Sequence, residues 1–113
     1  MSAVNKTLSL IGFATKARKI LFGAELTVKA VRKGKNSGVY LMLYASDASD
    51  NTKKKITDCS AFHKVPAIML EQTSAELSKI TGKLHAVAVM GIADEGFAKA
   101  IMKSLSDVEV HGE

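Results

Sequence analysis

The chain has 113 residues, of which 47% are hydrophobic, so it is long enough for one domain with its own core but short for two. Sixteen lysines and arginines against eleven acidic residues leave a formal charge of +5, which favours a polyanionic partner. The single cysteine, Cys59, excludes an internal disulfide, and the sequence has neither the apolar core of a signal peptide nor a run long enough to span a membrane. We therefore expect one cytoplasmic domain over residues 1–113 that has no membrane partner.

The first half of the chain alternates between helix and strand signals. Apolar residues recur at helical spacing from Ser2 to about Lys16, which predicts an amphipathic helix, and a short strand follows over 20–22. A cationic helix then begins at Gly23. The glycine-rich stretch over 34–38 interrupts the pattern, and residues 39–44 are apolar on both faces, which predicts a strand in the middle of a sheet.

Helices in the second half are indicated by their capping residues. Side chains from Ser46 to Ser49 offer caps for a third helix, whose residue Cys59 and one of Phe62 and His63 should face inward. Thr73 and Glu76 have the form of a capping box for a short helix that reaches Ile80. Gly82 should end that helix. The last helix is predicted to open at Asp94, and the polar tail over 107–113 is expected to fray.

The remaining strands are predicted over 65–70 and 85–90, and Gly91 and Gly96 are expected to flank a turn. Helix and strand thus alternate over nearly the whole length. This order predicts an α/β fold in which a four-stranded, mixed but largely parallel sheet lies between helices. With no tryptophan and 5% aromatic residues, the core should be aliphatic, and the four methionines after residue 40 should lie in it.

The start of the helix at Gly23 is the strongest candidate for a binding site. Glycine allows another backbone to approach closely, and the unpaired N–H groups of a first helical turn bind anions such as phosphate. Glu25, Lys29 and Arg32 then fall at i, i+4 and i+7 on one stripe beside this turn, with Lys33 next to it. This arrangement is suited to RNA.

The same helix also has an interpretation that needs no ligand. In either case Leu26, Ala30 and Val31 should face the interior, and without a ligand Glu25 and Lys29 would form a favourable ion pair within an ordinary amphipathic helix. Spacing alone does not separate the two interpretations.

Other residues with reactive side chains fit structural roles better. Cys59 and His63 are four residues apart but lack a third, orienting group, and the histidines lack the spacing of a metal site, so no metal or cofactor is expected. Asp47 should cap a helix, because an acidic pair for Mg²⁺ is missing after the first strand. The lysines at 53–55 form either a solvated face or a secondary contact with RNA or the ribosome. No glycine-rich phosphate motif occurs.

Four segments carry a more specific pattern: Ala17–Gly23, Thr27–Ala30, Ser46–Lys55 and Asp94–Ala98. Together with the element order, they resemble the ribosomal protein L-seven-Ae superfamily over roughly residues 5 to 105, and within it a small bacterial branch. The resemblance implies a three-layer α/β/α sandwich. It also implies a non-enzymatic protein, without a small-molecule substrate, that binds kink-turn RNA, a sharply bent internal loop with tandem sheared G·A pairs.

The residues that bind RNA in the family can be matched to positions of this chain one by one. Gly23 matches the glycine that begins the RNA-facing helix, and Lys29 matches the lysine six residues later. The best-known members have Asn-Glu two and three residues after that glycine, where this chain has Glu25-Leu26. The Glu25 carboxylate is able to accept hydrogen bonds from guanine N1–H and N2–H₂, which Leu26 cannot do. The loop over 82–87 matches the apolar tip that covers extruded bases in relatives.

We therefore predict an RNA-binding site on two walls, one at the helix and one at the loop. Its residues are Lys19, Gly23, Ala24, Glu25, Lys29, Arg32, Lys33, Leu84, His85, Ala86 and Val87. The expected partner is structured RNA, in the ribosome or in an mRNA leader. The alternative is a protein–protein adaptor that presents the same basic helix face to an acidic partner.

Overall fold

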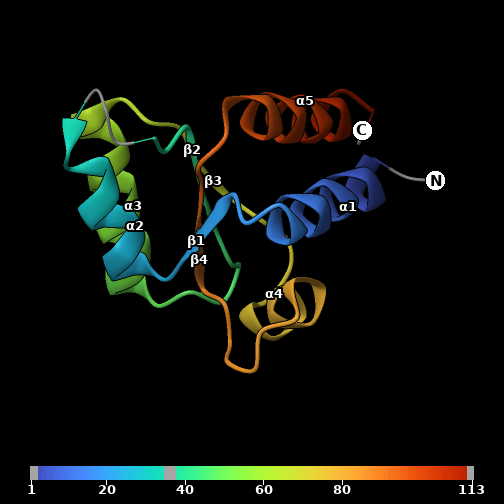
Figure 1. Cartoon of the computed structure of the whole chain (residues 1–113), viewed down its shortest axis with the longest axis horizontal. Helices are drawn as coiled ribbons and strands as arrows, with labels where there is room; N and C mark the ends of the chain where they lie inside the picture. The colour runs from blue at the N-terminus through green and yellow to red at the C-terminus, as the bar shows by residue number, and fades with distance from the viewer. Residues whose placement is uncertain (1–2, 35–37, 112–113) are drawn as a thin grey trace.

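The computed structural model describes residues 3–34 and 38–111, with side chains described for 6–34 and 38–106, and it forms three layers (Figure 1). A sheet stands in the middle. Two helices cover one face, α2 (Ala24–Val31) and α3 (Asp50–His63), and three cover the other, α1 (Ala3–Lys16), α4 (Ser74–Thr81) and α5 (Glu95–His111). The predicted α/β/α sandwich is confirmed.

The sheet has the strand order β1-β4-β2-β3. Its strands are β1 (Ile20–Phe22), β2 (Leu41–Tyr44), β3 (Ala67–Met69) and β4 (Val89–Ile92). Strand β2 pairs with β3 in parallel, whereas β4 is antiparallel to both β1 and β2. The mixed sheet is confirmed, but the prediction that it is largely parallel is wrong. The reversed strand β4 lies between β1 and β2, so two of the three strand pairings are antiparallel.

The reversal of β4 has a visible cause in the chain that precedes it. After β3, the Leu70 N–H donates to the Tyr44 carbonyl, and before β4 the Ala45 N–H donates to the Ala88 carbonyl, each at 2.8 Å. The segment between Leu70 and Ala88, which contains α4, therefore leaves β3 and enters β4 at the same end of the strands, beside the carboxyl end of β2. The chain does not cross back to the opposite end of the strands, which a parallel strand would require, so β4 runs antiparallel to β2.

Most helix ends are where their capping residues predicted. The Ser49 hydroxyl accepts the Thr52 N–H at 3.1 Å, and Thr73 and Glu76 form the reciprocal capping box. Asp94 accepts the Phe97 N–H at 2.8 Å and so begins α5. Asp47 does cap a helix, but it is α4: its carboxylate accepts from the backbone and hydroxyl of Ser74.

Strands β2 and β3 are shorter than predicted, and two other boundaries differ more strongly from the sequence predictions. Strand β4 begins at Val89 rather than at residue 85, since the preceding residues form the loop from α4. The helix α5 runs to His111 and includes most of the tail expected to fray, because no glycine or proline interrupts it after Gly96. The interruption predicted over 34–38 includes residues 35–37, which lie outside the described residues.

The core is aliphatic, as predicted, and it is divided by the sheet. One cluster of buried residues packs between the sheet and α1, α4 and α5, and a second between the sheet and α2 and α3. Met42 and Met90 are fully buried, but Met69 is 51% exposed because β3 is an edge strand. Within the described part of the chain, no helix is long and apolar enough to cross a membrane.

Candidate nucleic-acid interface

The amino end of α2 is open. Gly23 donates its N–H to the Val89 carbonyl at 2.9 Å and has φ 102° and ψ 147°, a conformation that favours glycine. As the N-cap it has no side chain to accept a hydrogen bond, and the first helical bond is Thr27 N–H to Gly23 O at 3.1 Å. The N–H groups of Ala24, Glu25 and Leu26 thus have no partner among the described residues and can bind an anion.

The charged stripe beside this turn is exposed, as expected from the spacing of Glu25, Lys29 and Arg32. Within residues 6–34 and 38–106 the only ion pair joins Lys99 to Glu95, at 3.7 Å. The helical pair between Glu25 and Lys29, on which the interpretation without a ligand depended, does not form. Both side chains are therefore available to a ligand.

The inward face of α2 differs from the prediction at one position, Leu26. Thr27, Val28 and Val31 are buried, whereas Leu26, which was expected to face the interior, is 51% exposed. Its side chain instead lies beside the open turn, in a shallow depression lined by Phe22, Gly23, Ala24, Glu25, Leu26 and Lys29. Val31 is buried and Ala30 packs against the core as predicted, so only Leu26 was assigned to the wrong side of the helix.

Gly91 explains how closely α2 sits on the sheet. A Cβ atom at this position would lie 2.9 Å from Thr27 Cγ2 and 3.2 Å from Thr27 Oγ1. Gly91 is not beside a turn, as the sequence suggested, but in β4, where it pairs with Leu21 on one side and Met42 on the other. The missing side chain lets α2 pack directly against the central strand, which fixes the position of the open turn.

The second predicted wall lies next to the first. Strand β4 starts beside Gly23, and the loop that leads into it places Lys83 Nζ 4.3 Å from the centroid of the Phe22 ring. Leu84 is 97% exposed, and His85 and Ala86 are exposed as well. The structure therefore brings the loop and the helix together.

Two residues of the predicted set lie elsewhere. Val87 is 5% exposed and belongs to the core, because it comes directly before the central strand, so it cannot form part of the wall. Lys19 is exposed but lies at the other end of β1, where its carbonyl accepts the Ala93 N–H at 2.7 Å. The length of the strand separates it from Gly23 by about 13 Å.

Phe22, Leu26 and Lys83 were not predicted as site residues. Phe22 was treated only as strand, and Lys83 only as part of a loop. The sequence did contain a signal for two of them. Phe22 directly precedes Gly23, and Leu26 follows Gly23 by three positions, so two large apolar residues flank the same turn. Without knowing how α2 is rotated about its axis, these residues could not be distinguished from residues of the core.

The surroundings of Cys59 and of the possible metal ligands do not favour catalysis or metal binding. Burial raises the pKa of the Cys59 thiol, and the nearby Arg32 guanidinium lowers it by a smaller amount. A thiol held in its neutral form is a poor nucleophile. Among the described residues, no group of three or more histidine, cysteine or acidic side chains could hold a metal ion.

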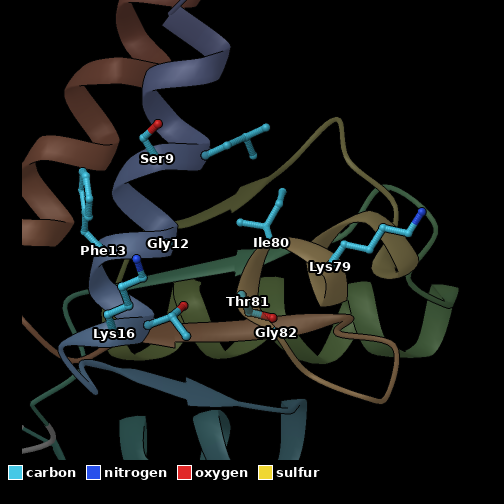
Figure 2. A pocket seen from close by; sticks show the side chains of 10 residues that line it. Ser9, Gly12, Phe13, Lys16, Lys79, Ile80, Thr81 and Gly82 are labelled. Atoms are coloured by element: carbon cyan, nitrogen blue, oxygen red, sulfur yellow. The ribbon is translucent and has the colours of Figure 1, made fainter.

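A different groove lies in the opposite layer, between α1 and α4 (Figure 2). It has a volume of about 650 Å³ and is lined by side chains that include Leu8, Phe13, Lys16, Lys79 and Ile80. None of the predicted site residues lines it. The groove is therefore separate from the candidate interface.

The chain matches a family model described as "Ribosomal protein L7Ae/L30e/S12e/Gadd45 family" over residues 5–102. It is 43% identical over 94 residues to "RNA-binding protein YlxQ" of Enterococcus faecium, which covers 83% of this chain and 85% of that protein. Identity to "RNA-binding protein YlxQ" of Bacillus subtilis strain 168 is 38% over 96 residues, with 85% and 91% covered. A solved structure of a protein of unknown function from Bacillus halodurans C is 36% identical, with a TM-score of 0.82 over 89% of this chain and 97% of that one.

Proposed function

This chain belongs to the ribosomal protein L7Ae/L30e/S12e/Gadd45 family, and from this premise we propose that it is a non-enzymatic protein that binds kink-turn RNA. The names of the two curated relatives, which describe them as RNA-binding proteins, support RNA as the partner. The family description supports an RNA of the ribosome or of another ribonucleoprotein as the target. The alternative, an adaptor for an acidic protein, predicts no dependence on RNA structure.

The observation that carries the proposal is the meeting of the open α2 turn with the loop from α4. The contact between Lys83 and Phe22 joins the two walls. Proteins recognise structured RNA through unusual shape, extruded bases and phosphate contacts more than through duplex grooves. An anion-binding turn next to an exposed apolar tip at Leu84 meets these needs.

Each part of the interface then has a role. The free N–H groups of the first turn of α2 and the side chains of Lys29, Arg32 and Lys33 bind phosphates. The Glu25 carboxylate accepts hydrogen bonds from the sheared guanines. The loop residues Leu84, His85 and Ala86 cover an extruded base, and Lys19 contacts a more distant phosphate.

The mechanism is binding without covalent chemistry. A free kink-turn RNA interconverts between extended and bent forms, and a protein that contacts only the bent form shifts the population toward it. The difference in affinity for the two forms sets the size of the shift. Ala24 and Glu25 are positioned before binding by the packing of α2 on Gly91, and the loop by the contact between Lys83 and Phe22, which lowers the cost of association.

A gel-shift titration in a salt series tests the proposal. The probes are a kink-turn RNA and a matched RNA in which Watson–Crick pairs replace the sheared G·A pairs. We expect tight binding only to the kink-turn, with affinity falling with salt at a log–log slope of about −3 if about four phosphates are neutralised. Weak and equal binding to both RNAs contradicts kink-turn recognition and favours the adaptor.

Two substitutions separate the roles of the helix residues. Lys29→Ala should weaken binding to both RNAs and reduce the salt slope by about one, because it removes a phosphate contact. Glu25→Ala should reduce the preference for the kink-turn by about tenfold or more, because it removes a base contact. The control is Lys103→Ala, at an exposed position of α5 in the other layer. It should change neither the affinity for the two RNAs nor the preference for the kink-turn. Equal effects of the first two variants on both RNAs contradict the assigned roles.

A further inference from the structure

The candidate interface continues into a groove between α2 and α3. A depression lined by Glu25, Val28, Lys29, Arg32 and Lys55 adjoins the open turn of α2, with which it shares Glu25 and Lys29. A second depression shares Arg32 and Lys55 with the first and extends to Asp58, Cys59, Phe62 and His63. The two helices lie side by side on one face of the sheet (Figure 1). A continuous path therefore leads from the open turn to the end of α3.

Phe62, at the far end of this path, is unusually exposed. The sequence left open whether this residue or His63 faces inward, but the Phe62 side chain is 82% exposed and His63 is half-buried. The two rings meet edge to face, with centroids 4.9 Å apart and an interplanar angle of 78°. A single exposed apolar side chain is common on protein surfaces, but this ring lies in the same depression as the Arg32 and Lys55 cations.

Cations line the path between the open turn and Phe62. Lys29, Arg32 and Lys55 follow one another along it, and in the described part of the chain none of them forms an ion pair with Glu25 or Asp58. A groove of unpaired cations that ends at an exposed aromatic ring is the combination that binds single-stranded nucleic acid. The cations follow the phosphates, and the ring stacks on a base whatever its sequence.

We propose that the groove between α2 and α3 binds unpaired nucleotides that continue from the RNA held at the α2 turn. Arg32 and Lys55 contact the phosphates of this segment, and one base stacks on Phe62. The inference rests on the proposed function, because the groove is entered from the kink-turn site. It assigns the lysine at position 55 to RNA, whereas Lys53 and Lys54 need no such role.

Affinity measurements with extended RNAs test the groove. The blunt kink-turn RNA is compared with two versions that carry about four unpaired nucleotides at the 5′ or the 3′ end of the strand beside the bend. One of the two extensions should increase the affinity of the unmodified protein by about tenfold, since stacking of one base contributes this much or more. The same extension should leave the preference for sheared G·A pairs unchanged.

Matched variants assign the gain to the groove. Phe62→Ala should abolish the gain from the extension while binding the blunt RNA like the unmodified protein, and Lys55→Gln should reduce the gain. The controls are Phe13→Ala and Lys79→Gln, which remove an exposed ring and an exposed cation from the groove in the other layer. Both controls should retain the full gain.

The failures are distinguishable. If the kink-turn is preferred but neither extension improves binding, or if Phe62→Ala keeps the full gain, the groove proposal alone is overturned. If the blunt kink-turn and its Watson–Crick control bind equally, the proposed function fails, and the continuation that depends on it fails as well. A gain lost equally in Phe13→Ala also overturns the groove as its source.

Discussion

The two helical layers differ in how they are held to the sheet. Among the described residues, thirteen buried side chains form the cluster under α1, α4 and α5, but only seven form the cluster under α2 and α3. The layer with the smaller core carries the open turn, the charged stripe and the groove that ends at Phe62. The larger core thus supports the fold, and the smaller one positions a surface whose side chains remain free for a ligand.

The largest expected effect compares one buried isoleucine from each layer. Ile101 on α5 and Ile56 on α3 are both fully buried. Truncation to alanine should cost about 2–5 kcal/mol of the free energy of unfolding in each case, with the larger loss for Ile101→Ala because its more extensive surroundings relax less into the cavity. Urea unfolding measures both losses.

RNA titration of the same two variants, under conditions where each is folded, sharpens the contrast. Ile56→Ala should alter RNA affinity because α3 forms one side of the groove, whereas Ile101→Ala should leave it unchanged. Loss of RNA affinity in Ile101→Ala would show that the two layers are not independent. Equal losses of stability would show that cluster size does not decide the cost.

The second prediction concerns the contact that positions α2. Gly91→Ala places a Cβ 2.9 Å from Thr27 Cγ2 in the middle of the sheet, and overpacking of this kind costs about 1–3 kcal/mol. Since the strain is relieved by moving α2 away from β4, the variant should also bind RNA more weakly. Thermal unfolding and RNA titration report the two effects.

Two further variants test that explanation. Adding Thr27→Ala to Gly91→Ala removes the opposing atoms and should restore most of the lost stability, which appears as a favourable coupling in the double-mutant cycle. Gly12→Ala on α1 is the control: a Cβ there meets nothing within 4 Å, so the helix should gain about 0.5–1 kcal/mol. Independent effects at Gly91 and Thr27 would contradict the contact.

The local parts of this fold were predictable from the sequence, and its long-range pairing was not. Ser49, the Thr73–Glu76 capping box and Asp94 act within a few residues of their own positions, so their signals can be read directly. The direction of β4 depends on where the segment after Leu70 returns to the sheet. That return is fixed by contacts between distant segments, which an alternation of helix and strand does not encode.

The candidate site shows the same division. Gly23 and the charged stripe could be predicted because their spacing is local, and the loop was placed with them only through the family resemblance. Leu26 and Val87 were assigned to the wrong sides. The exposure of Leu26 depends on how α2 is rotated against β4, and the burial of Val87 depends on where the central strand begins.

The third prediction uses an unsatisfied group in the smaller core. Thr27 Oγ1 is buried and has no hydrogen-bond partner in the described part of the chain. Valine has nearly the same shape without the polar atom, so Thr27→Val should stabilise the protein by about 1 kcal/mol by removing the desolvation cost. The matched change Thr7→Val, at a buried hydroxyl bonded to Ser104 between α1 and α5, should destabilise it. A loss of stability in Thr27→Val, measured by urea unfolding, would contradict this reasoning.

The smallest expected effect concerns the thiol of Cys59, which lines the groove beside Arg32. Burial raises the pKa of Cys59 and the Arg32 charge partly opposes it, so Arg32→Gln should raise the pKa further. Only the thiolate reacts with iodoacetamide, so at a fixed pH the variant should be alkylated more slowly, and its rate profile should move to higher pH. Mass spectrometry of the folded protein over a pH series measures both.

The alkylation rate of Cys59 also distinguishes the two layers, because Arg32, the cation that affects its pKa, lies in the groove between α2 and α3. Lys16→Gln, which removes a cation from the opposite groove, is the matched control and should leave the alkylation profile of Cys59 unchanged. Faster alkylation in Arg32→Gln would mean that the guanidinium shields the thiol sterically more than it acts through its charge. An equal shift in both variants would mean that the thiol responds to the net charge of the protein and not to its neighbour, which would contradict the assignment of this effect to Arg32.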